Sequence, residues 1–285
     1  FAFPGYEFFA ESISGVDYIE LGELSHTRFP DGESLVTLHT DVKDKEIILI
    51  CGLEYANAKS MPLMFFAHAA KDFGAKSITL IAPYLGYMRQ DIRFQPGQAI
   101  TSKIFAKFLS LYFDRLITFD PHLHRFSSLD ELYTIPTTVL HAAPSIGAWV
   151  KKNIENPIII GPDEESLQWV QEVAKHAEGP CIVAKKIRYS DREVEISMPD
   201  LTAYADLSPV VIDDIISTAQ TMVKTVEHIH GFGMKPVTCI GIHALFVGDA
   251  YTDLKKTGVA QIVTSNTIPH KSNAIDLTKS FSEIL

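Results

Sequence analysis

Short apolar runs alternate with longer amphipathic stretches along most of the chain. Each run predicts a buried strand, and the runs are residues 47–51, 78–82, 116–119, 157–160, 181–184, 210–212, 239–242 and 261–263. Apolar positions at helical spacing predict helices over residues 59–73, 102–111, 145–152, 164–176 and 218–230. Strands that alternate with helices indicate the α/β class, with mainly parallel sheets flanked by helices.

The alternating units form two groups that meet near residues 141–145. The second group begins with a helix and then a fresh strand, and no Gly/Ser-rich linker separates it from the first. We therefore predict two α/β domains, residues 1–142 and 143–285, that pack closely and bind ligands in the cleft between them. The last residues are expected to pack back on the first domain.

The first 45 residues follow a different pattern. Residues 17–22 and 34–39 are expected to form strands on either side of the turn Arg28-Phe29-Pro30-Asp31-Gly32-Glu33. The Pro-Asp-Gly centre is typical of a turn, and a solvated loop is the simplest interpretation of these residues taken alone.

Length and composition indicate a soluble globular protein, because 285 residues with 46% hydrophobic content can form sizeable cores. No apolar run approaches the roughly 20 residues that cross a bilayer, and the start resembles no signal peptide, so we expect a cytoplasmic protein without a membrane partner. The formal net charge of −10 argues against nucleic acid but allows local basic clusters. Three widely spaced cysteines predict buried free thiols: Cys51, Cys181 and Cys239.

Carboxylates and hydroxyls follow the expected strand at 210–212. Asp213 and Asp214 lie at its carboxyl end, and the hydroxyl residues that lead into the next helix are Ser217, Thr218 and Thr221. The N–H groups and dipole of a first helical turn favour phosphate, and adjacent carboxylates can accept hydrogen bonds from ribose hydroxyls. The pattern predicts a sugar-phosphate site; the alternative is an Asp-rich turn with hydroxyl caps.

Residues 83–94 follow another strand and carry two tyrosines and two arginines, among them Arg89. The segment is too polar for a core position, so we expect a projecting loop that offers stacking surfaces and guanidinium groups to a nucleotide. An interface loop is the alternative.

Two more polar groups come directly after expected strands. His122, near Asp120, follows residues 116–119, and Asp163 follows residues 157–160. Carboxylate oxygens suit magnesium, and His122 can bind a magnesium-associated phosphate or a metal. The pair His122-Leu-His124 does not resemble a tetrahedral zinc site, because no cysteine or third close ligand accompanies it.

A basic segment, residues 184–188, precedes a polar stretch and the extended residues 194–197. Lys186 and Arg188 on a mobile loop could close over a triphosphate and stabilise charge that develops during transfer. An exposed charged hairpin is the alternative. A lid of residues 186–193 has little apolar surface, so we do not expect it to be ordered without a ligand.

Taken together and in this order, these motifs resemble the ribose-phosphate pyrophosphokinase (phosphoribosyl pyrophosphate synthetase) family over residues 3–284. The resemblance implies two tandem type I phosphoribosyltransferase-like domains. It implies transfer of the diphosphate of ATP to ribose 5-phosphate, which gives phosphoribosyl pyrophosphate and AMP and requires Mg²⁺. It also implies a homo-oligomer, a dimer or dimer-based assembly, with ATP bound across a subunit boundary.

The resemblance assigns a role to each motif. Lys186 and Arg188 would be the catalytic pair, and His122 and Asp163 would serve the magnesium-diphosphate centre. ATP would be bound by Phe29, Asp31 and Glu33 of a neighbouring subunit and by Arg89, Gln90, Asp91 and His122. Ribose 5-phosphate would be bound by Asp213, Asp214, Ser217, Thr218, Ala219, Gln220 and Thr221. The Asp-Pro-His and Lys-x-Arg forms look more like the archaeal branch, which leaves regulation by phosphate or ADP open.

One residue departs from the pattern of the family, which usually has glycine where this chain has Gln220. Glycine permits a positive φ and close approach of the backbone to phosphate; if position 220 needs a positive φ, glutamine costs about 1–2 kcal/mol. If the glutamine side chain instead enters the phosphate site, substrate binding could be lost. Two functions therefore stay open, an active diphosphokinase and a catalytically silent, synthetase-like regulatory subunit. A phosphoribosyltransferase that consumes phosphoribosyl pyrophosphate would have no use for the Arg89 segment or a second domain.

Overall fold

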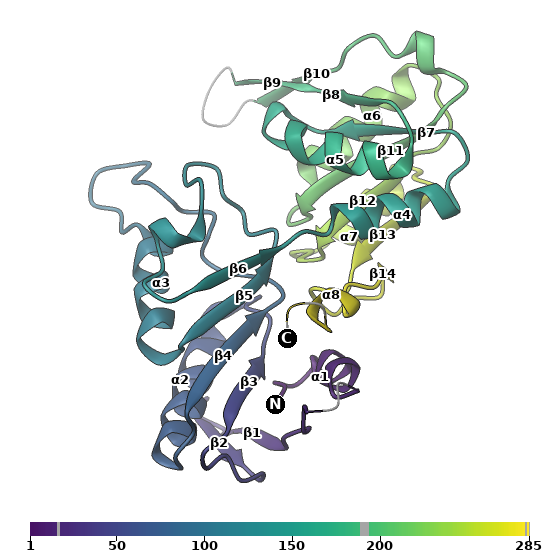
Figure 1. The fold of residues 1–285 in the computed structure, drawn as a ribbon. Helices are drawn as coiled ribbons and strands as arrows, with labels where there is room; N and C mark the ends of the chain where they lie inside the picture. The colour runs from purple at the N-terminus through teal and green to yellow at the C-terminus, as the bar shows by residue number, and fades with distance from the viewer. Residues whose placement is uncertain (16–17, 189–193, 283, 285) are drawn as a thin grey trace. The chain divides into compact units, whose positions relative to one another are not determined.

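The computed structural model describes residues 1–15, 18–188, 194–282 and 284 and divides into two compact units (Figure 1). Unit 1 comprises Phe1–Leu140 and Thr278–Leu285, and unit 2 comprises His141–Leu277. In neither unit do the described residues include a helix that is both long and apolar enough to cross a bilayer.

Unit 1 is built on a four-stranded parallel sheet in the order β3 (Glu46–Ile50), β4 (Ser77–Ala82), β5 (Arg115–Phe119), β6 (Thr137–Leu140). Side chains alternate between the two faces of a strand. On one face Leu49 and Leu80 join a core with Phe66 of α2 (Ala56–Asp72) and Leu109 of α3 (Thr101–Tyr112). The predicted parallel sheet with helical cover is confirmed here.

The opposite face of this sheet is covered by two short helices from the two ends of the chain, α1 (Glu7–Ile13) and α8 (Lys279–Ser282). The ring of Phe281 lies 5.1 Å from that of Phe9 and 5.2 Å from that of Phe119, measured between centroids, and all three side chains are fully buried. The last residues of the chain therefore contribute to the core of unit 1.

A separate antiparallel hairpin precedes the sheet, formed by β1 (Leu24–Arg28) and β2 (Ser34–Leu38). The strand expected at 17–22 is wrong: residues 18–22 form no strand, Tyr18 is 74% exposed, and residues 16–17 lie outside the described part. A strand needs a neighbour, and at Ile50 the edge of β3 is already paired with Ala2.

Unit 2 contains a six-stranded sheet with the order β14-β13-β12-β11-β7-β8, in which all neighbours are parallel. The strands are β7 (Pro157–Gly161), β8 (Cys181–Val183), β11 (Ser208–Ile215), β12 (Thr238–His243), β13 (Gln261–Ser265) and β14 (Asn273–Ile275). The chain passes from β7 outward to β8 and later returns to β11 on the other side of β7. The gap between the carboxyl ends of β7 and β11 is thus a topological switch point, where open α/β sheets bind ligands.

The α-helices in the described part of unit 2 are α4 (Ala143–Asn153), α5 (Leu167–Ala177), α6 (Gln220–Gly231) and α7 (Ala250–Lys256). α5 starts later than predicted because a 3₁₀ turn, Glu164–Ser166, precedes it, and α6 starts two residues later than predicted. A second hairpin consists of β9 (Lys185–Arg188) and β10 (Val194–Ser197). All three cysteines are free as predicted; Cys51 and Cys239 are buried, but Cys181 is only partly so.

Candidate active site

Three carboxylates meet at the switch point of unit 2. Asp163 follows β7, and Asp213 and Asp214 lie within β11, which continues to Ile215 rather than ending at residue 212 as predicted. Burial, then the charges of Asp214 and Asp163, raise the pKa of the Asp213 carboxyl well above its ordinary value. The structure therefore brings Asp163 and Asp213 together from sequence positions that are far apart.

The backbone beside Asp213 and Asp214 is held in place by their own side chains. Asp213 Oδ1 accepts a hydrogen bond from the Asp214 N–H at 3.0 Å, and Asp214 Oδ1 accepts one from the Ile215 N–H at 2.8 Å. The Asp213 and Asp214 side chains also share a hydrogen bond, and both residues are partly exposed. The two carboxyl groups therefore lie together near the carboxyl end of β11.

The loop after β11 is fixed against the segment that follows β12. Phe246 N–H donates to Ile216 O at 2.8 Å, and Val247 N–H donates to Ser217 O at 3.0 Å. A Cβ atom at Gly241 would lie 2.6 Å from Ile216 Cδ1, so a larger residue there would have to displace the Ile216 side chain. Glycine at 241 thus leaves room for this buried side chain.

The backbone of this loop shows which residue has the left-handed conformation. The left-handed residue is Ala219, with φ 58° and ψ 4°, and Gln220 is the exposed first residue of α6. Glutamine at 220 therefore carries no left-handed strain. The N-cap residue of α6 is Ala219, whose side chain makes no capping hydrogen bond, and Ser217, Thr218 and Thr221 lie beside this helix start, which suits an anion.

Residues 83–94 of unit 1 differ from the predicted projecting loop. Tyr84, Leu85 and Met88 are buried, and the latter two belong to the core of this unit. The segment becomes exposed at Arg89, so only its second half can meet a ligand. The polar composition of residues 83–94 did not reveal that the first half is buried and the second half exposed, because apolar residues are interspersed among the polar ones.

The residues after Arg89 have structural partners. Gln90 Oε1 accepts a hydrogen bond from the Thr101 N–H at 3.1 Å, and this bond caps the start of α3. Asp91 is only 5% exposed and forms an ion pair with Arg125, whose Nη1 lies 2.7 Å from Asp91 Oδ1. Sequence analysis missed Arg125, since nothing in the sequence links it to a carboxylate 34 residues away.

His122 lies three residues after the end of β5, and the backbone turns sharply between them at Asp120, which has a φ of 30°. Its Nε2 atom contacts Nε2 of His124, and the two rings lie 3.8 Å apart between centroids at an interplanar angle of 86°. Leu123, between them, packs on the core of unit 1. The two imidazoles therefore project on the same side of an anchored segment.

The turn of the β1–β2 hairpin is exposed along residues 27–33 and closes on itself. Phe29 N–H donates to Glu33 O at 2.8 Å, Glu33 N–H donates to Asp31 Oδ1 at 3.1 Å, and the Phe29 side chain is 46% exposed. Figure 1 shows this hairpin at the lower end of unit 1, below the sheet. Phe29, Asp31 and Glu33 are thus presented outward from the unit.

Lys186 and Arg188 lie in β9, where their backbones pair with Ile196 and Val194 of β10. The basic segment is therefore part of a hairpin. Residues 189–193, which complete the expected lid, lie outside the described residues.

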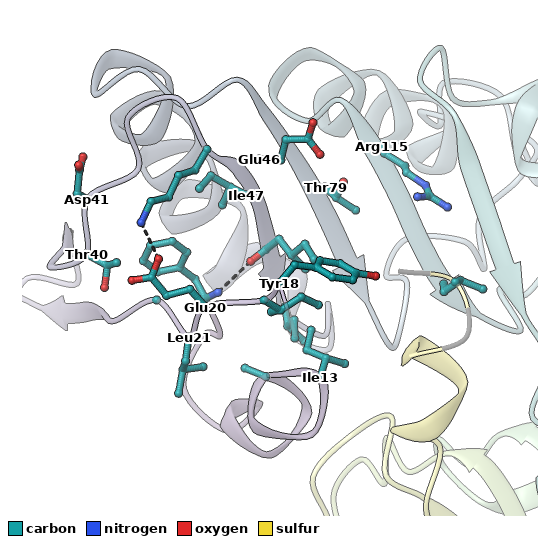
Figure 2. Close-up of a pocket in the computed structure, with 18 residues that line it drawn as sticks. Ile13, Tyr18, Glu20, Leu21, Thr40, Asp41, Glu46, Ile47, Thr79 and Arg115 are labelled. Atoms are coloured by element: carbon teal, nitrogen blue, oxygen red, sulfur yellow. Dashed lines mark hydrogen bonds and ion pairs between the residues drawn. The ribbon is translucent and has the colours of Figure 1, made fainter. Parts of the chain in front are cut away.

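A pocket of about 530 Å³ lies on unit 1 between the sheet and residues 18–22 (Figure 2). Strand residues such as Ile47, Thr79 and Arg115 line it, and Lys45 and Glu20 form an ion pair of 2.7 Å at its edge. None of the residues that the sequence assigned to ATP, ribose 5-phosphate or metal lines this pocket. It is therefore separate from the candidate active site.

Comparison with known proteins covers both units. Residues 1–112 match the N-terminal domain of ribose phosphate pyrophosphokinase, and residues 128–278 match the phosphoribosyl transferase domain. A Saccharolobus solfataricus protein named ribose-phosphate pyrophosphokinase is 34% identical over 263 residues, which cover 90% of this chain and 89% of the relative. A protein of the same name from Campylobacter jejuni is 30% identical and covers 97% of this chain and 91% of its own.

The fold has a full-length counterpart among solved structures. The crystal structure of phosphoribosylpyrophosphate synthetase from Mycobacterium smegmatis matches with a TM-score of 0.83 at 18% identity and covers 99% of this chain and 95% of that chain. At 18% identity the structural match shows only the shared fold, whereas the sequence relatives and the family models show membership of the family. This chain belongs to the ribose-phosphate pyrophosphokinase family.

Proposed function

We propose that this protein is a ribose-phosphate diphosphokinase, which transfers the diphosphate of ATP to the anomeric oxygen of ribose 5-phosphate and releases AMP. The observation that carries the proposal lies at the switch point of unit 2, where Asp213 and Asp214 in β11 are followed by a hydroxyl-rich loop and the start of α6. Relatives of the same family name cover nine-tenths of the chain or more.

The two parts of ribose 5-phosphate call for different groups, and the loop supplies both. The 5-phosphate suits the first-turn N–H groups of α6 together with the hydroxyls of Ser217, Thr218 and Thr221. The ribose hydroxyls suit the carboxylates of Asp213 and Asp214, which accept hydrogen bonds. Gln220 is exposed at the first helical position, so its amide N–H₂ can add a donor to the phosphate instead of straining the loop.

The carboxylates also fit the Mg²⁺ that the family implies. Burial, and then the charges of Asp214 and Asp163, raise the pKa of Asp213, and a cation at this position would favour the charged form of its carboxyl. No group of three or more His, Cys, Asp or Glu side chains able to hold a metal occurs among the described residues. Magnesium usually takes one or two carboxylates and completes its shell with water and substrate phosphates, where it neutralises charge on the diphosphate.

We assign ATP to the residues of unit 1 that the sequence singled out. Arg89, Gln90, Asp91 and His122 would hold the nucleotide, and Phe29, Asp31 and Glu33 would act on the ATP of a neighbouring subunit in a homo-oligomer. The outward presentation of the β1–β2 turn supports the second assignment. Lys186 and Arg188 would stabilise the transferring diphosphate, and the cytoplasm is the expected location.

The silent regulatory subunit is the competing function, and its best support is Gln220, through backbone strain or through a side chain that enters the phosphate site. Because Gln220 is helical and Ala219 carries the positive φ, backbone strain at Gln220 does not support it. Purified protein with ATP, Mg²⁺ and ribose 5-phosphate should form AMP and phosphoribosyl pyrophosphate in equal amounts. Absence of AMP from the wild type, under conditions where a Gln220→Gly variant forms it, would exclude an active enzyme.

A further inference from the structure

The segment between β12 and α7 contains a strained residue beside the loop of residues 216–219, to which we assign ribose 5-phosphate. Phe246 has a φ of 34°, which a residue other than glycine rarely adopts. Its N–H group and that of Val247 donate to the carbonyl oxygens of Ile216 and Ser217, at 2.8 Å and 3.0 Å. Because the φ and ψ angles of Phe246 set the angle between these two N–H groups, both reach the loop only in this strained conformation.

The ring of Phe246 is held by two other rings of unit 2. It stacks on His270, with 4.6 Å between the ring centroids and 29° between the planes. Tyr251 meets it edge-on, at 5.3 Å and 85°, and lies 5.1 Å from His270. Rings at these separations and angles attract one another. The side chain of Phe246 is therefore fixed from two sides, and its backbone with it.

His270 is itself tied to the sheet of unit 2. Its backbone N–H donates to Asn273 Oδ1 at 2.8 Å, and its Nδ1 atom accepts a hydrogen bond from the Ser272 N–H at 3.2 Å. The Ser272 hydroxyl oxygen lies 2.6 Å from the same Nδ1 atom and 2.8 Å from the hydroxyl oxygen of Thr264, a buried residue of β13. The imidazole on which Phe246 stacks therefore has a defined orientation.

We propose that Phe246 is a positioning residue for ribose 5-phosphate. Its ring, clamped by His270 and Tyr251, keeps a strained backbone in the conformation that fixes the loop at Ile216 and Ser217. Strain that the surrounding structure enforces can pre-organise a binding loop, which lowers the cost of ordering it when the ligand binds. The inference rests on the proposed function, because it takes this loop as the ribose-phosphate site.

The test is calorimetric titration of ribose 5-phosphate into the full chain, with Mg²⁺ and α,β-methylene-ATP, whose α–β linkage cannot be cleaved. Phe246→Ala should weaken binding of ribose 5-phosphate about tenfold, the factor that corresponds to left-handed strain at a residue other than glycine. Phe246→Gly should weaken it less, because glycine adopts a positive φ without strain. A residue needed only for its volume would give the opposite order, since glycine removes more of the side chain.

A matched control is Phe232→Ala. Phe232 is likewise a half-buried phenylalanine packed on the core of unit 2, but it lies at the other end of α6 from the loop. Its loss should leave the affinity for ribose 5-phosphate unchanged, and every variant should bind α,β-methylene-ATP as the wild type does. If Phe246→Ala does not fold, His270→Ala, which removes one face of the clamp, should weaken binding of ribose 5-phosphate in its place.

Two results would overturn the proposal: unchanged affinity for ribose 5-phosphate in Phe246→Ala and His270→Ala, or weaker binding by Phe246→Gly than by Phe246→Ala. A wild type that does not bind ribose 5-phosphate would contradict both the proposal and the diphosphokinase function. A wild type that binds it through the clamped loop but forms no AMP from ATP would contradict only the diphosphokinase function.

Discussion

The loop between β11 and α6 makes a prediction that separates two neighbouring residues. Glycine at 220, as most of the family has it, should destabilise this protein, because Gln220 already has helical backbone angles. Glycine in a helix costs about 0.5–1 kcal/mol relative to alanine, through the greater freedom of the unfolded chain. If position 220 had a positive φ, the same substitution would relieve about 1–2 kcal/mol of strain.

The expected changes in the free energy of unfolding follow from the cost of glycine in a helix and the strain of a positive φ. Gln220→Gly should lower the free energy of unfolding by up to about 0.5–1 kcal/mol, the cost inside a helix, because 220 is the first helical position; a change of 1 kcal/mol shifts Tm by about 2–4 °C in domains of this size. Gln220→Ala, the matched control, should be neutral or slightly stabilising. At Ala219 the relief of left-handed strain is offset by the loss of a buried methyl group, about 0.8 kcal/mol, and by the cost of glycine, so Ala219→Gly should be nearly neutral.

The assay is thermal unfolding of the three variants and the wild type by circular dichroism, with AMP formation measured in parallel. A Gln220→Gly variant that melts above the wild type would refute the assignment of the strain to Ala219. A large gain in its AMP formation would restore the interpretation in which glutamine blocks the phosphate loop.

Three further predictions concern charged residues. Asp213→Asn should abolish phosphoribosyl pyrophosphate formation but stabilise the ligand-free protein. Because the folded-state pKa of Asp213 is raised, the wild type loses stability as pH rises above the ordinary carboxyl range, so the variant's Tm should exceed that of the wild type by more at pH 7 than at pH 4. A Tm difference that is smaller at pH 7 than at pH 4 would contradict this sign. Arg125→Ala leaves the buried Asp91 carboxylate without its ion pair and should lower the free energy of unfolding, measured with denaturant, by about 1–3 kcal/mol. This is less than the cost of breaking a fully buried pair, because the Arg125 side chain is 48% exposed. Adding Asp91→Asn should recover part of the loss, and no recovery would mean that the ion pair is not the cause. Lys186→Ala should depress turnover far more than ATP affinity, and equal losses in steady-state kinetics and nucleotide titration would mean a binding role instead.

The parallel sheets could be predicted because their strands are buried on both faces, and the sequence shows this directly as short apolar runs. The end of β11 could not be predicted, since Asp213 and Asp214 interrupt the apolar run. What extends the strand is backbone pairing with β12, up to Ile215 opposite His243. Hydrogen bonds of that kind depend on a partner that local composition does not reveal.

The site was predicted as a set of motifs, but the conformation within each motif was not. Comparison with the glycine of the family pointed to position 220, and only the backbone shows that the left-handed residue is Ala219. The polar character of residues 83–94 concealed the buried Leu85 and Met88. The Asp91–Arg125 pair joins distant segments, so neither residue alone indicated it.

The most direct test of the proposed function is one reaction followed by chromatography. The wild type is incubated with ATP, Mg²⁺ and ribose 5-phosphate, with Asp213→Asn and a reaction without ribose 5-phosphate as controls. The wild type should form AMP and phosphoribosyl pyrophosphate in equal amounts, and both controls should form neither. Formation of ADP instead of AMP, or AMP that does not depend on ribose 5-phosphate, would contradict diphosphate transfer.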